Sequence, residues 1–306
     1  MARSIGIDIG GTKIEATVFA DDWSKLHSQR VPTPHDTYEN LVSAVIGQAQ
    51  WARAKAGRDV PVGIGIPGLH NRETGLASTA NIPATGHSFR ADLTTAIGCH
   101  ITYGNDCDLF ALSEARLGAG QGYQTVFGLI IGTGIGAGIC HDGHVITTLN
   151  GGAGEVGHIP VSGRLTLAYD LPVLTCGCGQ KGCAETLASG LGLTRLAKLV
   201  AGADLPPPEI ARLLAQGDDQ ALRIMQIWSE IMQELLGSIQ RTIDPDIIVL
   251  GGGLTHIEGL VDWIKIGLEN RMLRGSTSPE IVLAKYGDSS GTRGAAIAAL
   301  SEQGVA

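Results

Sequence analysis

The chain has 306 residues and a formal net charge of −8; 43% of its residues are hydrophobic and 17% are charged. This composition supplies enough apolar material for buried cores and excludes a disordered chain. The negative charge, without clusters of Lys and Arg, argues against a nucleic-acid-binding surface. No apolar run approaches the roughly 18 residues of a membrane span, and the N-terminus lacks the apolar stretch of a signal peptide. We therefore expect a cytoplasmic protein without nucleic-acid or membrane partners.

The first third of the chain predicts alternating strands and helices. Ser4–Phe19 has the pattern of two β-branched strands joined by a Gly-Gly turn, which is a β-hairpin. The elements expected after it are a strand at Lys25–Val31, a helix at Tyr38–Lys55, a buried strand within Val62–Gly68, a strand at Ile101–Tyr103 and a helix at Leu109–Leu117. Asn105 and Asp106 therefore fall at a strand-to-helix junction, where α/β enzymes commonly place active groups.

The rest of the chain repeats this pattern. Residues 125–146 predict a strand, a glycine-rich turn, a second strand and a turn at Asp142 and Gly143. The elements expected further on are helices at Ala188–Val200 and Pro208–Thr242, a buried strand running into Gly251–Gly253, and a helix of small residues at Thr292–Glu302. Because its residues are small, the last helix is expected to pack closely onto the first domain.

The length of 306 residues exceeds the usual size of one compact core, so two domains are expected. Two glycine-tipped hairpins suggest that both are α/β domains of similar construction. The predicted division is a small domain at residues 1–117, to which residues 288–306 return, and a large domain at residues 118–287. A cleft between the two domains is the expected place for an active site.

The first glycine turn, Asp8-Ile9-Gly10-Gly11-Thr12-Lys13, brings a carboxylate, two glycine amides, a hydroxyl and an ammonium group together. Glycine amides approach phosphate oxygens closely, Asp8 can hold Mg²⁺ through water, and Thr12 or Lys13 can contact phosphate. The nucleotide-binding residues predicted here are Asp8, Gly10, Gly11, Thr12 and Lys13. The alternative is a tight turn with a solvated lysine.

A second glycine turn spans Gly132–Gly138. It lacks the Gly-Lys-Ser/Thr ending of the Walker motif, and it is followed by a predicted strand, whereas a dinucleotide fingerprint is followed by a helix. Two hairpins of this type, together with the glycines after the late buried strand, indicate ATP with Mg²⁺ and not NAD. The nucleotide-binding residues predicted here are Gly132, Thr133, Gly134, Ile135, Gly136, Gly138, Gly252 and Gly253.

Three cysteines, Cys176, Cys178 and Cys183, lie within eight residues. This spacing suits Zn²⁺, and His158 in another glycine-rich stretch completes a Cys₃His set. Four protein ligands leave no open position, so the zinc is expected to be structural. A disulfide is the alternative, which a cytosolic chain and the one-residue gap disfavour. The remaining cysteines are expected to be buried free thiols, and they are Cys99, Cys107 and Cys140.

Three carboxylates are candidates for contact with an alcohol substrate. Phosphoryl transfer to a hydroxyl needs a carboxylate that takes its proton, and Asp106 is the candidate. The alternative is that Asp106 caps the following helix. A zinc site would pin the loops of Glu155 and Glu185, whose carboxylates could accept hydrogen bonds from sugar hydroxyls. Glu185 has the alternative role of complementing the dipole of a helix that it opens.

With these motifs laid out, the chain resembles the ROK family (repressor, open reading frame, kinase) of bacterial sugar kinases across essentially its whole length. The motifs that carry the resemblance are Asp8–Lys13, Asn105-Asp106, Gly132–Gly138, GEVGH at Gly154–His158 and CGCGQKGCAET at Cys176–Thr186. The resemblance implies the actin-like ATPase (ribonuclease H-like) fold, with two α/β domains around a cleft, and usually a homodimer. It implies that Asp106 is the catalytic base and that zinc is held by His158 and the three cysteines. The sugar contacts that it implies are Asn105, Glu155, His158 and Glu185.

Sequences outside the shared motifs, among them ANIPATGHSFRADL and LPVLTCGCGQKGC, are most similar to bacterial kinases of N-acetyl-D-glucosamine. This resemblance implies phosphorylation of the 6-hydroxyl of that sugar by MgATP, and it implies that Ser78, Thr79 and Asn81 lie near the sugar. Glucokinase, fructokinase and N-acetylmannosamine kinase are alternatives, because these sugars differ by few contacts. The alternative that is not an enzyme is a sugar-sensing regulator. It needs an added helix-turn-helix domain, for which the residues before Ile5 leave no room.

Two further expectations concern neighbours of these residues. The family often continues Asn-Asp-Ala-Asn, whereas this chain continues with Cys107 and Asp108. A carboxylate at Asp108 would raise the pKa of Asp106 if it faced the site, and would have no effect from the outer face of the helix. Because His158 can bind zinc and, by resemblance, contact the sugar, metal loss is expected to weaken sugar binding before ATP binding.

Overall fold

The protein is described from a computed structural model, which describes residues 1–71, 73–79, 81–146, 148–287 and 290–302. The chain forms two compact units. Unit 1 comprises Met1–Gly122, Gly138–Ala153 and Tyr286–Ala306, and unit 2 comprises Tyr123–Ala137 and Gly154–Lys285. Residues 138–153 thus group with the first unit. The sequence predicts domain limits after residues 117 and 287. These limits remain a prediction of where independently folding domains begin and end.

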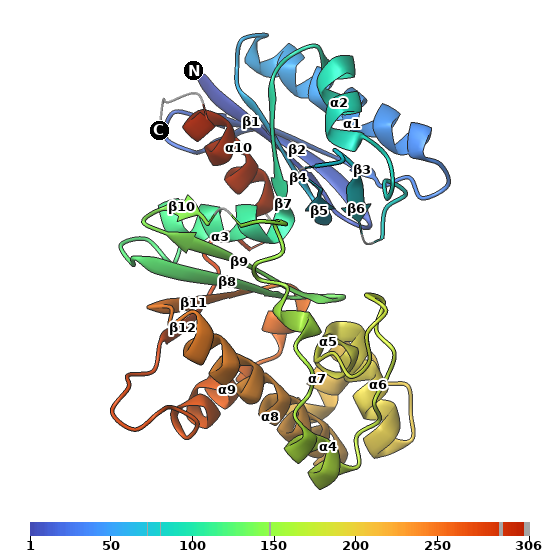
Figure 1. Cartoon of the computed structure of the whole chain (residues 1–306), viewed down its shortest axis with the longest axis vertical. Coiled ribbons are helices and arrows are strands. Elements are labelled where there is room, and N and C mark those ends of the chain that lie inside the picture. Colours follow the sequence, from blue (N-terminus) through green and yellow to red (C-terminus); the bar gives the residue numbers. More distant parts are fainter. Residues whose placement is uncertain (72, 80, 147, 288–289, 303–306) are drawn as a thin grey trace. The chain divides into compact units, whose positions relative to one another are not determined.

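Unit 1 is built on a five-stranded sheet with the order β3-β2-β1-β4-β7. Its strands are β1 (Ala2–Ile9), β2 (Lys13–Ala20), β3 (Lys25–Pro32), β4 (Val62–Ile66) and β7 (Ile101–Asn105). The first three strands are antiparallel neighbours, whereas β1, β4 and β7 are parallel. A separate hairpin joins β5 (Gly68–His70) to β6 (Ala77–Thr79). The predicted strands and the glycine-tipped hairpin of this unit are confirmed (Figure 1).

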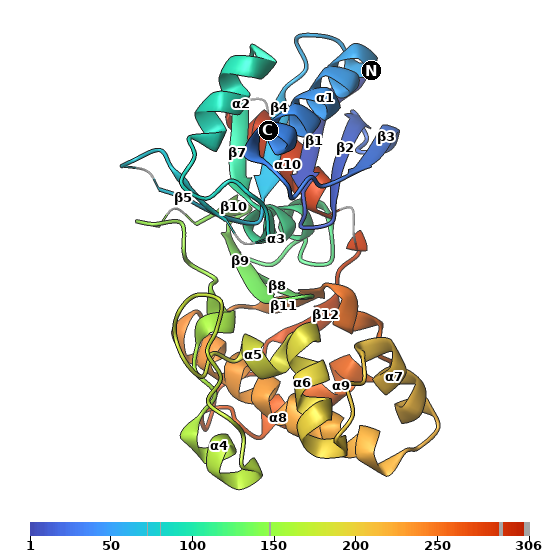
Figure 2. The ribbon, with the colours of Figure 1, turned by 90° about the vertical axis from the view of Figure 1, so that its right-hand side faces the viewer.

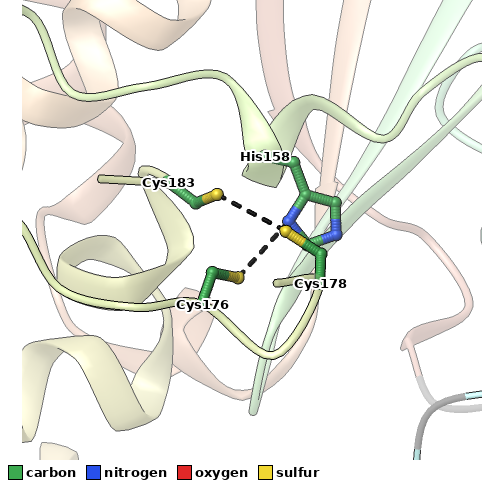
Figure 3. A group of neighbouring side chains, drawn as sticks. All are labelled: His158, Cys176, Cys178 and Cys183. Atoms are coloured by element: carbon green, nitrogen blue, oxygen red, sulfur yellow. Dashed lines mark hydrogen bonds between the residues drawn. The ribbon is translucent and has the colours of Figure 1, made fainter. Parts of the chain in front are cut away.

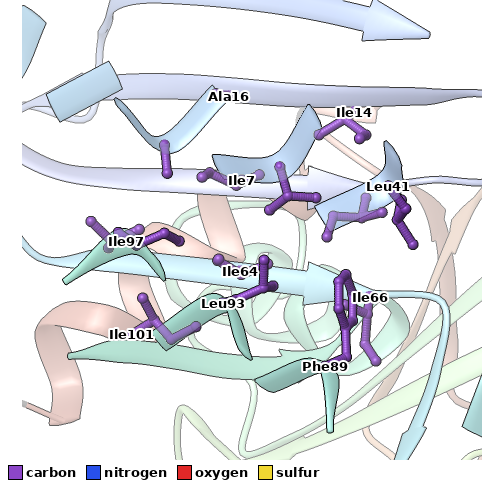
Figure 4. Packing of buried hydrophobic residues seen from close by; sticks show 14 of the residues in the cluster. Ile7, Ile14, Ala16, Leu41, Ile64, Ile66, Phe89, Leu93, Ile97 and Ile101 are labelled. Carbon is purple, nitrogen blue, oxygen red and sulfur yellow. The ribbon is translucent and has the colours of Figure 1, made fainter. Parts of the chain in front are cut away.

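The two faces of this sheet differ because isoleucine and glycine alternate along its central strands β1 and β4. Ile5, Ile7 and Ile9 of β1 are fully buried in one cluster with α1 (Tyr38–Ala56) and α2 (Phe89–Ile97). Leu41 from α1 and Phe89 from α2 close this core (Figure 4). Since side chains alternate across a strand, the glycines between the isoleucines point to the opposite face.

The glycine face accepts the backbone of α10 (Ser290–Glu302). A Cβ on Gly6 would lie 1.7 Å from the Thr292 carbonyl oxygen, and a Cβ on Gly63 would lie 1.9 Å from the Ala295 carbonyl oxygen. In the same helix, a Cβ on Gly294 would lie 1.8 Å from the carbonyl oxygen of Leu109 in α3 (Asp106–Leu117). The prediction that the last helix packs closely onto the first part of the chain is therefore confirmed.

The second sheet repeats the strand order of the first, as β10-β9-β8-β11-β12. Its strands are β8 (Thr125–Ile131), β9 (Ile135–His141), β10 (His144–Val145), β11 (Ile247–Gly251) and β12 (Glu280–Leu283). The turn between β9 and β10 has positive φ at both Asp142 and Gly143, as a type I′ turn requires. The repeated order confirms the predicted α/β class and the similar construction of the two sheets.

Helices make up most of the rest of unit 2 (Figure 2). They are α4 (Gly163–Tyr169), α5 (Glu185–Ala188), α6 (Gly190–Ala201), α7 (Pro207–Ala215), α8 (Asp219–Thr242) and α9 (Leu260–Glu269), with short 3₁₀ turns η1 (Val156–His158) and η2 (Gly253–His256). Trp228 of α8 is fully buried, and its indole N–H donates to the Ala188 carbonyl at 2.8 Å. Among the described residues, no helix combines the length and apolarity that crossing a membrane requires.

One helix prediction is wrong: the stretch Pro208–Thr242 forms two helices, α7 and α8. Gly217 between them has φ 75°, a left-handed conformation that ends a helix, and Asp218 begins the next one by accepting a hydrogen bond from the Ala221 N–H at 2.8 Å. Similarly, the helix expected at Ala188–Val200 is α6, and Ser189 separates it from the short α5 by capping the Gly192 N–H.

The glycine face generates the first prediction. Gly6→Ala should destabilise the protein by at least about 1–3 kcal/mol, because its Cβ would overlap the backbone of α10. Gly47→Ala is the matched control: Gly47 lies on the exposed side of α1 with open space around it, so alanine should stabilise by about 0.5–1 kcal/mol. The measurement is the midpoint of urea unfolding. Equal midpoints for the two variants would contradict the backbone contact.

Candidate functional site

The first glycine turn is held closed from two sides. The Gly10 N–H donates to the Lys13 carbonyl at 2.9 Å, which closes the hairpin between β1 and β2. Thr33, just after β3, donates its N–H to the Thr12 carbonyl at 3.1 Å and its hydroxyl to the Gly10 carbonyl at 2.7 Å. The turn therefore has one defined shape, as a phosphate cradle requires.

Asp8 lies against the beginning of α10. A Cβ on Gly291 would lie 2.6 Å from an Asp8 carboxylate oxygen, so glycine alone leaves room for this carboxylate. The first turn of a helix carries unsatisfied N–H groups and the positive end of the dipole, which favour a carboxylate. Sequence reasoning missed both Gly291 and Thr33, because each is distant in the chain from the turn that it contacts and no local pattern marks it.

Asn81, shortly after β6, lies beside the first glycine turn. The Cβ of Asn81 is 3.2 Å from the position that a Cβ on Gly11 would take, and Asn81 has φ 63°. Asparagine tolerates this left-handed conformation better than most residues, and such positions are common at functional sites. Thr79 closes the loop, because its hydroxyl donates to the Ile82 carbonyl at 3.1 Å. Ser78 is exposed.

Asn105 and Asp106 lie at the junction of β7 and α3, as predicted. The cap of α3 is Asn105: its side-chain oxygen accepts from the Cys107 N–H at 2.9 Å and the Asp108 N–H at 3.2 Å. The Asn105 amide group also donates to the Gly68 carbonyl at 3.1 Å, which ties the hairpin of β5 and β6 to the start of α3. Asp106 is thus the first residue of the helix and not its N-cap, and its carboxylate also accepts from the Cys107 N–H at 2.9 Å.

Asp108 faces strand β9. At about 100° per residue it lies about 200° around the helix from Asp106. Its Cα is 2.5 Å from the position that a Cβ on Gly138 would take, so Gly138 lets α3 approach β9 closely. Burial raises the pKa of the Cys140 thiol in β9 to about 12, and the charge of Asp108 adds to this rise. Asp108 therefore lies on the side of α3 that packs against β9.

The second glycine turn joins β8 to β9. The Gly132 N–H donates to the Gly134 carbonyl at 2.9 Å, which forms the tip. Gly252, at the end of β11, has φ 89°, and a Cβ there would lie 2.5 Å from the Ile131 carbonyl oxygen. Gly252 and Gly253 therefore lie next to the point where β8 enters this turn, which is consistent with one nucleotide-binding surface in unit 2.

His158, Cys176, Cys178 and Cys183 form one cluster, and their four side chains point toward one another (Figure 3). The four ligand atoms lie within 4.8 Å of one another. The Cys178 and Cys183 sulfurs are 3.7 Å apart, and the Cys176 sulfur is 3.5 Å from His158 Nδ1. Tetrahedral zinc, with bonds of about 2.3 Å to sulfur and about 2.1 Å to nitrogen, would separate such atoms by about 3.8 and 3.6 Å. The residues fit a structural zinc, and all three cysteines are free thiols.

The thiols differ in how readily they lose their protons. Burial raises the pKa of Cys176 to about 12, whereas a hydrogen bond from the Gln180 N–H lowers the pKa of the exposed Cys178. Zinc binds thiolates and displaces these protons, so its binding strengthens as the pH rises. With four protein ligands, the metal would hold the two loops together and leave no position for a substrate.

Two carboxylates border the cluster. Glu155 lies 3.4 Å from His158 Nε2, the nitrogen that does not face the thiols, which is the usual arrangement for orienting a metal-bound histidine. Burial raises the pKa of Glu155; His158 opposes this rise and Glu185 adds to it. Glu185 accepts from the Cys176 thiol at 3.0 Å and, through its other oxygen, from the Ile135 N–H at 3.3 Å. Glu185 therefore contacts both the cluster and the second glycine turn.

Each unit gathers one part of the predicted site. In unit 1 the structure brings together the first glycine turn, the loop at Asn81 and the start of α10, and the hairpin at Gly68 contacts Asn105 beside Asp106. In unit 2 it brings together the zinc cluster, the two glutamates and the second glycine turn. The contact between Glu185 and Ile135 was not predicted, because the two residues are 50 positions apart.

Comparisons with known proteins agree with this geometry. The sequence matches the model of the ROK family over residues 4–302. It is 40% identical to an N-acetyl-D-glucosamine kinase of Photobacterium profundum, covering 95% of this chain and 97% of that protein. It is 38% identical to an N-acetylgalactosamine kinase of Shewanella sp., covering 95% of each. The structure is similar to that of a ROK family glucokinase from Streptomyces griseus in complex with glucose and AMPPNP, with a TM-score of 0.79, 29% identity and coverage of 96% and 98%.

The cluster generates the second prediction. Elemental analysis of the purified protein should find about one zinc per chain, and Cys178→Ser should lose the metal and lower the Tm, because structural zinc contributes to folding. Cys99→Ser is the matched control, since its thiol lies outside the cluster and should leave the zinc content unchanged. A metal-free wild-type protein with an unchanged Tm would refute the structural role.

Proposed function

Because the chain belongs to the ROK family, we propose that it is an ATP-dependent kinase that phosphorylates the 6-hydroxyl of N-acetyl-D-glucosamine. The observation that carries this proposal is the Asp106 carboxylate at the first position of α3, directly after the N-cap Asn105, in a chain that also has two glycine turns and a Cys₃His cluster. The 40% identity to an N-acetyl-D-glucosamine kinase over 95% of the chain supports the choice of sugar.

In the proposed reaction the oxygen of the 6-hydroxyl attacks the γ-phosphorus of ATP. The bond from the γ-phosphorus to the bridging oxygen of ADP breaks, and the hydroxyl proton passes to the Asp106 carboxylate. The products are N-acetylglucosamine 6-phosphate and ADP. A carboxylate at the first position of a rigid helix suits this role, since the base must lie within hydrogen-bond reach of one particular hydroxyl.

The two glycine turns would bind the nucleotide. Their backbone N–H groups donate to phosphate oxygens, and Thr12, Lys13 and Thr133 add side-chain donors. Mg²⁺, when bound, neutralises charge on the phosphates, and Asp8 would hold it through water. Gly252 and Gly253 would lie against the nucleoside, because they border the strand that enters the second turn.

The proposed sugar contacts are polar side chains. Ser78, Thr79, Asn81 and Asn105 are the proposed contacts in unit 1, and Glu155, His158 and Glu185 are those in unit 2. If zinc occupies Nδ1 of His158, its Nε2 carries the proton and donates, either to Glu155 or to a sugar hydroxyl. The carboxylates accept from sugar hydroxyls. Such paired donors and acceptors would discriminate between sugars that differ in one hydroxyl group.

We also propose that the protein works in the cytoplasm as a homodimer. ATP as a substrate and three thiols kept reduced for zinc suit a reducing compartment. Two apolar side chains of unit 2, Leu167 and Val173, are 86% and 61% exposed, and exposed apolar side chains of this kind are what a second copy of a chain covers. The mass of the protein in solution, measured by light scattering, tests this assembly.

A second candidate substrate is N-acetyl-D-galactosamine, which is favoured by the relative of 38% identity that is named for it. The two sugars differ only in the orientation of one hydroxyl group. Glucose, fructose and N-acetylmannosamine are further candidate substrates. A hydroxyl in the wrong orientation leaves a buried polar group of the site unpaired, which is how such a pocket discriminates.

The role of Asp106 generates the third prediction. Asp106→Asn should lower kcat by at least about 100-fold, because general-base catalysis contributes about 10²–10⁴ to such reactions, while the Kd for the sugar changes little. Asp108→Asn is the matched control: it removes a carboxylate two residues further on that faces β9, and it should retain kcat. The measurements are coupled ADP release and calorimetric sugar binding. Wild-type turnover by Asp106→Asn would remove this residue from the base role.

Sugar preference generates the fourth prediction. In a coupled ADP-release assay, kcat/KM should be highest for N-acetyl-D-glucosamine among that sugar, N-acetylgalactosamine, N-acetylmannosamine, glucose and fructose. A loss of at least about tenfold for each of the last four sugars is expected from one or two lost contacts. Equal efficiency with glucose would refute the choice of sugar. Binding of a sugar without turnover of any of the five would favour a sugar-sensing regulator.

A further inference from the structure

The second glycine turn is held by two segments that each contain one residue of the Cys₃His cluster. On one side, residues 154–158 end at His158. The Ala137 N–H donates to the Gly154 carbonyl at 3.0 Å, and a Cβ on Gly157 would lie 2.4 Å from the Ile135 carbonyl oxygen. This segment therefore packs directly against the backbone of the turn.

The other side of the turn is held by residues 183–190, which begin at Cys183. Glu185 accepts from the Ile135 N–H at 3.3 Å, and the Gly190 N–H donates to the Gly132 carbonyl at 2.7 Å. A Cβ on Gly190 would lie 2.9 Å from that carbonyl oxygen, so the contact is close. The turn is thus fixed at its first residue and near its tip by one short segment.

Glu185 is the side chain that links the cluster to the turn. One of its carboxylate oxygens lies 3.0 Å from the Cys176 sulfur, and the other accepts from the Ile135 N–H. We propose that Glu185 is a positioning residue that couples zinc binding to nucleotide binding at the second glycine turn. This inference rests on the proposed nucleotide-binding role of that turn.

The coupling has a defined sign. Zinc joins the segment of His158 to that of Cys183, and both segments must be in place for the turn to keep its shape. Since zinc and nucleotide stabilise the same arrangement, each should strengthen the binding of the other. One electrostatic effect opposes this mutual strengthening. Three thiolates and one Zn²⁺ carry a net charge of −1, which repels phosphate. Water and Mg²⁺ screen that repulsion, so the ordering effect dominates.

This coupling changes one expectation from the sequence, namely that metal loss weakens sugar binding before ATP binding. The Glu185 carboxylate contacts both the Cys176 thiol and the Ile135 N–H, and backbone hydrogen bonds join Gly154 and Gly190 to the turn. Metal loss should therefore weaken nucleotide binding directly. When zinc displaces the proton of Cys176, Glu185 loses that donor and retains the Ile135 N–H, so the carboxylate stays at the turn.

The experiment measures zinc release from the wild-type protein to a chromogenic chelator, without sugar. One sample contains Mg²⁺ and a non-hydrolysable ATP analogue, and the other contains Mg²⁺ alone. Calorimetry measures binding of the same analogue to the zinc-loaded and the zinc-depleted protein. Zinc release should slow by at least about fivefold with the analogue, and zinc should tighten analogue binding by a similar factor, because coupling is reciprocal.

Three variants separate positioning from general stability. Glu185→Ala removes the acceptor of the Ile135 N–H and should abolish the effect of the analogue on zinc release. Glu185→Gln keeps an acceptor oxygen and should restore it. Glu155→Ala is the matched control: its carboxylate contacts His158 and should weaken zinc binding by about 10–100-fold, as loss of such partners does, while the effect of the analogue remains.

The outcomes distinguish this proposal from the proposed function. If the analogue binds the wild-type protein but zinc release is unchanged, the coupling is refuted and the kinase proposal stands. If the analogue does not bind at all, both are refuted. If Glu155→Ala abolishes the effect as completely as Glu185→Ala does, general loosening of the cluster explains the result and the positioning role of Glu185 is refuted.

Discussion

Both parts of the site depend on one constraint. Backbone segments approach each other closely at positions where a side chain would not fit. In unit 1, Gly6 and Gly63 let α10 lie directly on the sheet, and Gly294 lets it lie on α3. The helix that begins at Asp106 is thereby held by backbone contacts, which vary less than side-chain packing does. In unit 2, Gly157 and Gly190 bring the zinc-binding segments against the second turn in the same way. The many glycines of the chain thus set distances as well as forming turns.

The two glycine turns have similar positions in their sheets and different supports. The first is closed by Thr33 and lies beside Asn81, within a unit whose sheet is covered by a large isoleucine core. The second lies beside residues 154–158, which form only a 3₁₀ turn, and residues 183–190, which contain the one-turn helix α5. The cysteines themselves lie in an irregular stretch, which opens easily unless something orders it. A metal that joins His158 to three cysteines supplies that order without a hydrophobic core. Structural zinc would therefore stabilise the irregular stretch that carries the cysteines, next to the segments that contact the second glycine turn.

Local patterns in the sequence predicted much of this structure. The hairpin turns, the cluster of Cys176, Cys178, Cys183 and His158, and the junction at Asn105 all depend on residues whose chemistry is evident from their spacing. The break at Gly217 also has a local signal, a glycine followed by a capping Asp218, but the long run of helix-forming residues around it outweighed that signal. The contact of Asp8 with α10 could not be predicted. It joins residues at opposite ends of the chain, and only the folded sheet brings them together.

Glu185 shows why a role assigned by resemblance is incomplete without geometry. By resemblance it contacts the sugar, and in the structure its two oxygens already contact the Cys176 thiol of the Cys₃His cluster and the backbone of the second glycine turn. A carboxylate has about four sites at which it accepts hydrogen bonds, so these partners and a sugar hydroxyl can be bound together. One side chain would then contact the metal site, the acceptor sugar and the turn that binds the donor nucleotide. A residue in that position makes the binding of each ligand depend on the others, which favours phosphoryl transfer to sugar over hydrolysis of ATP by water.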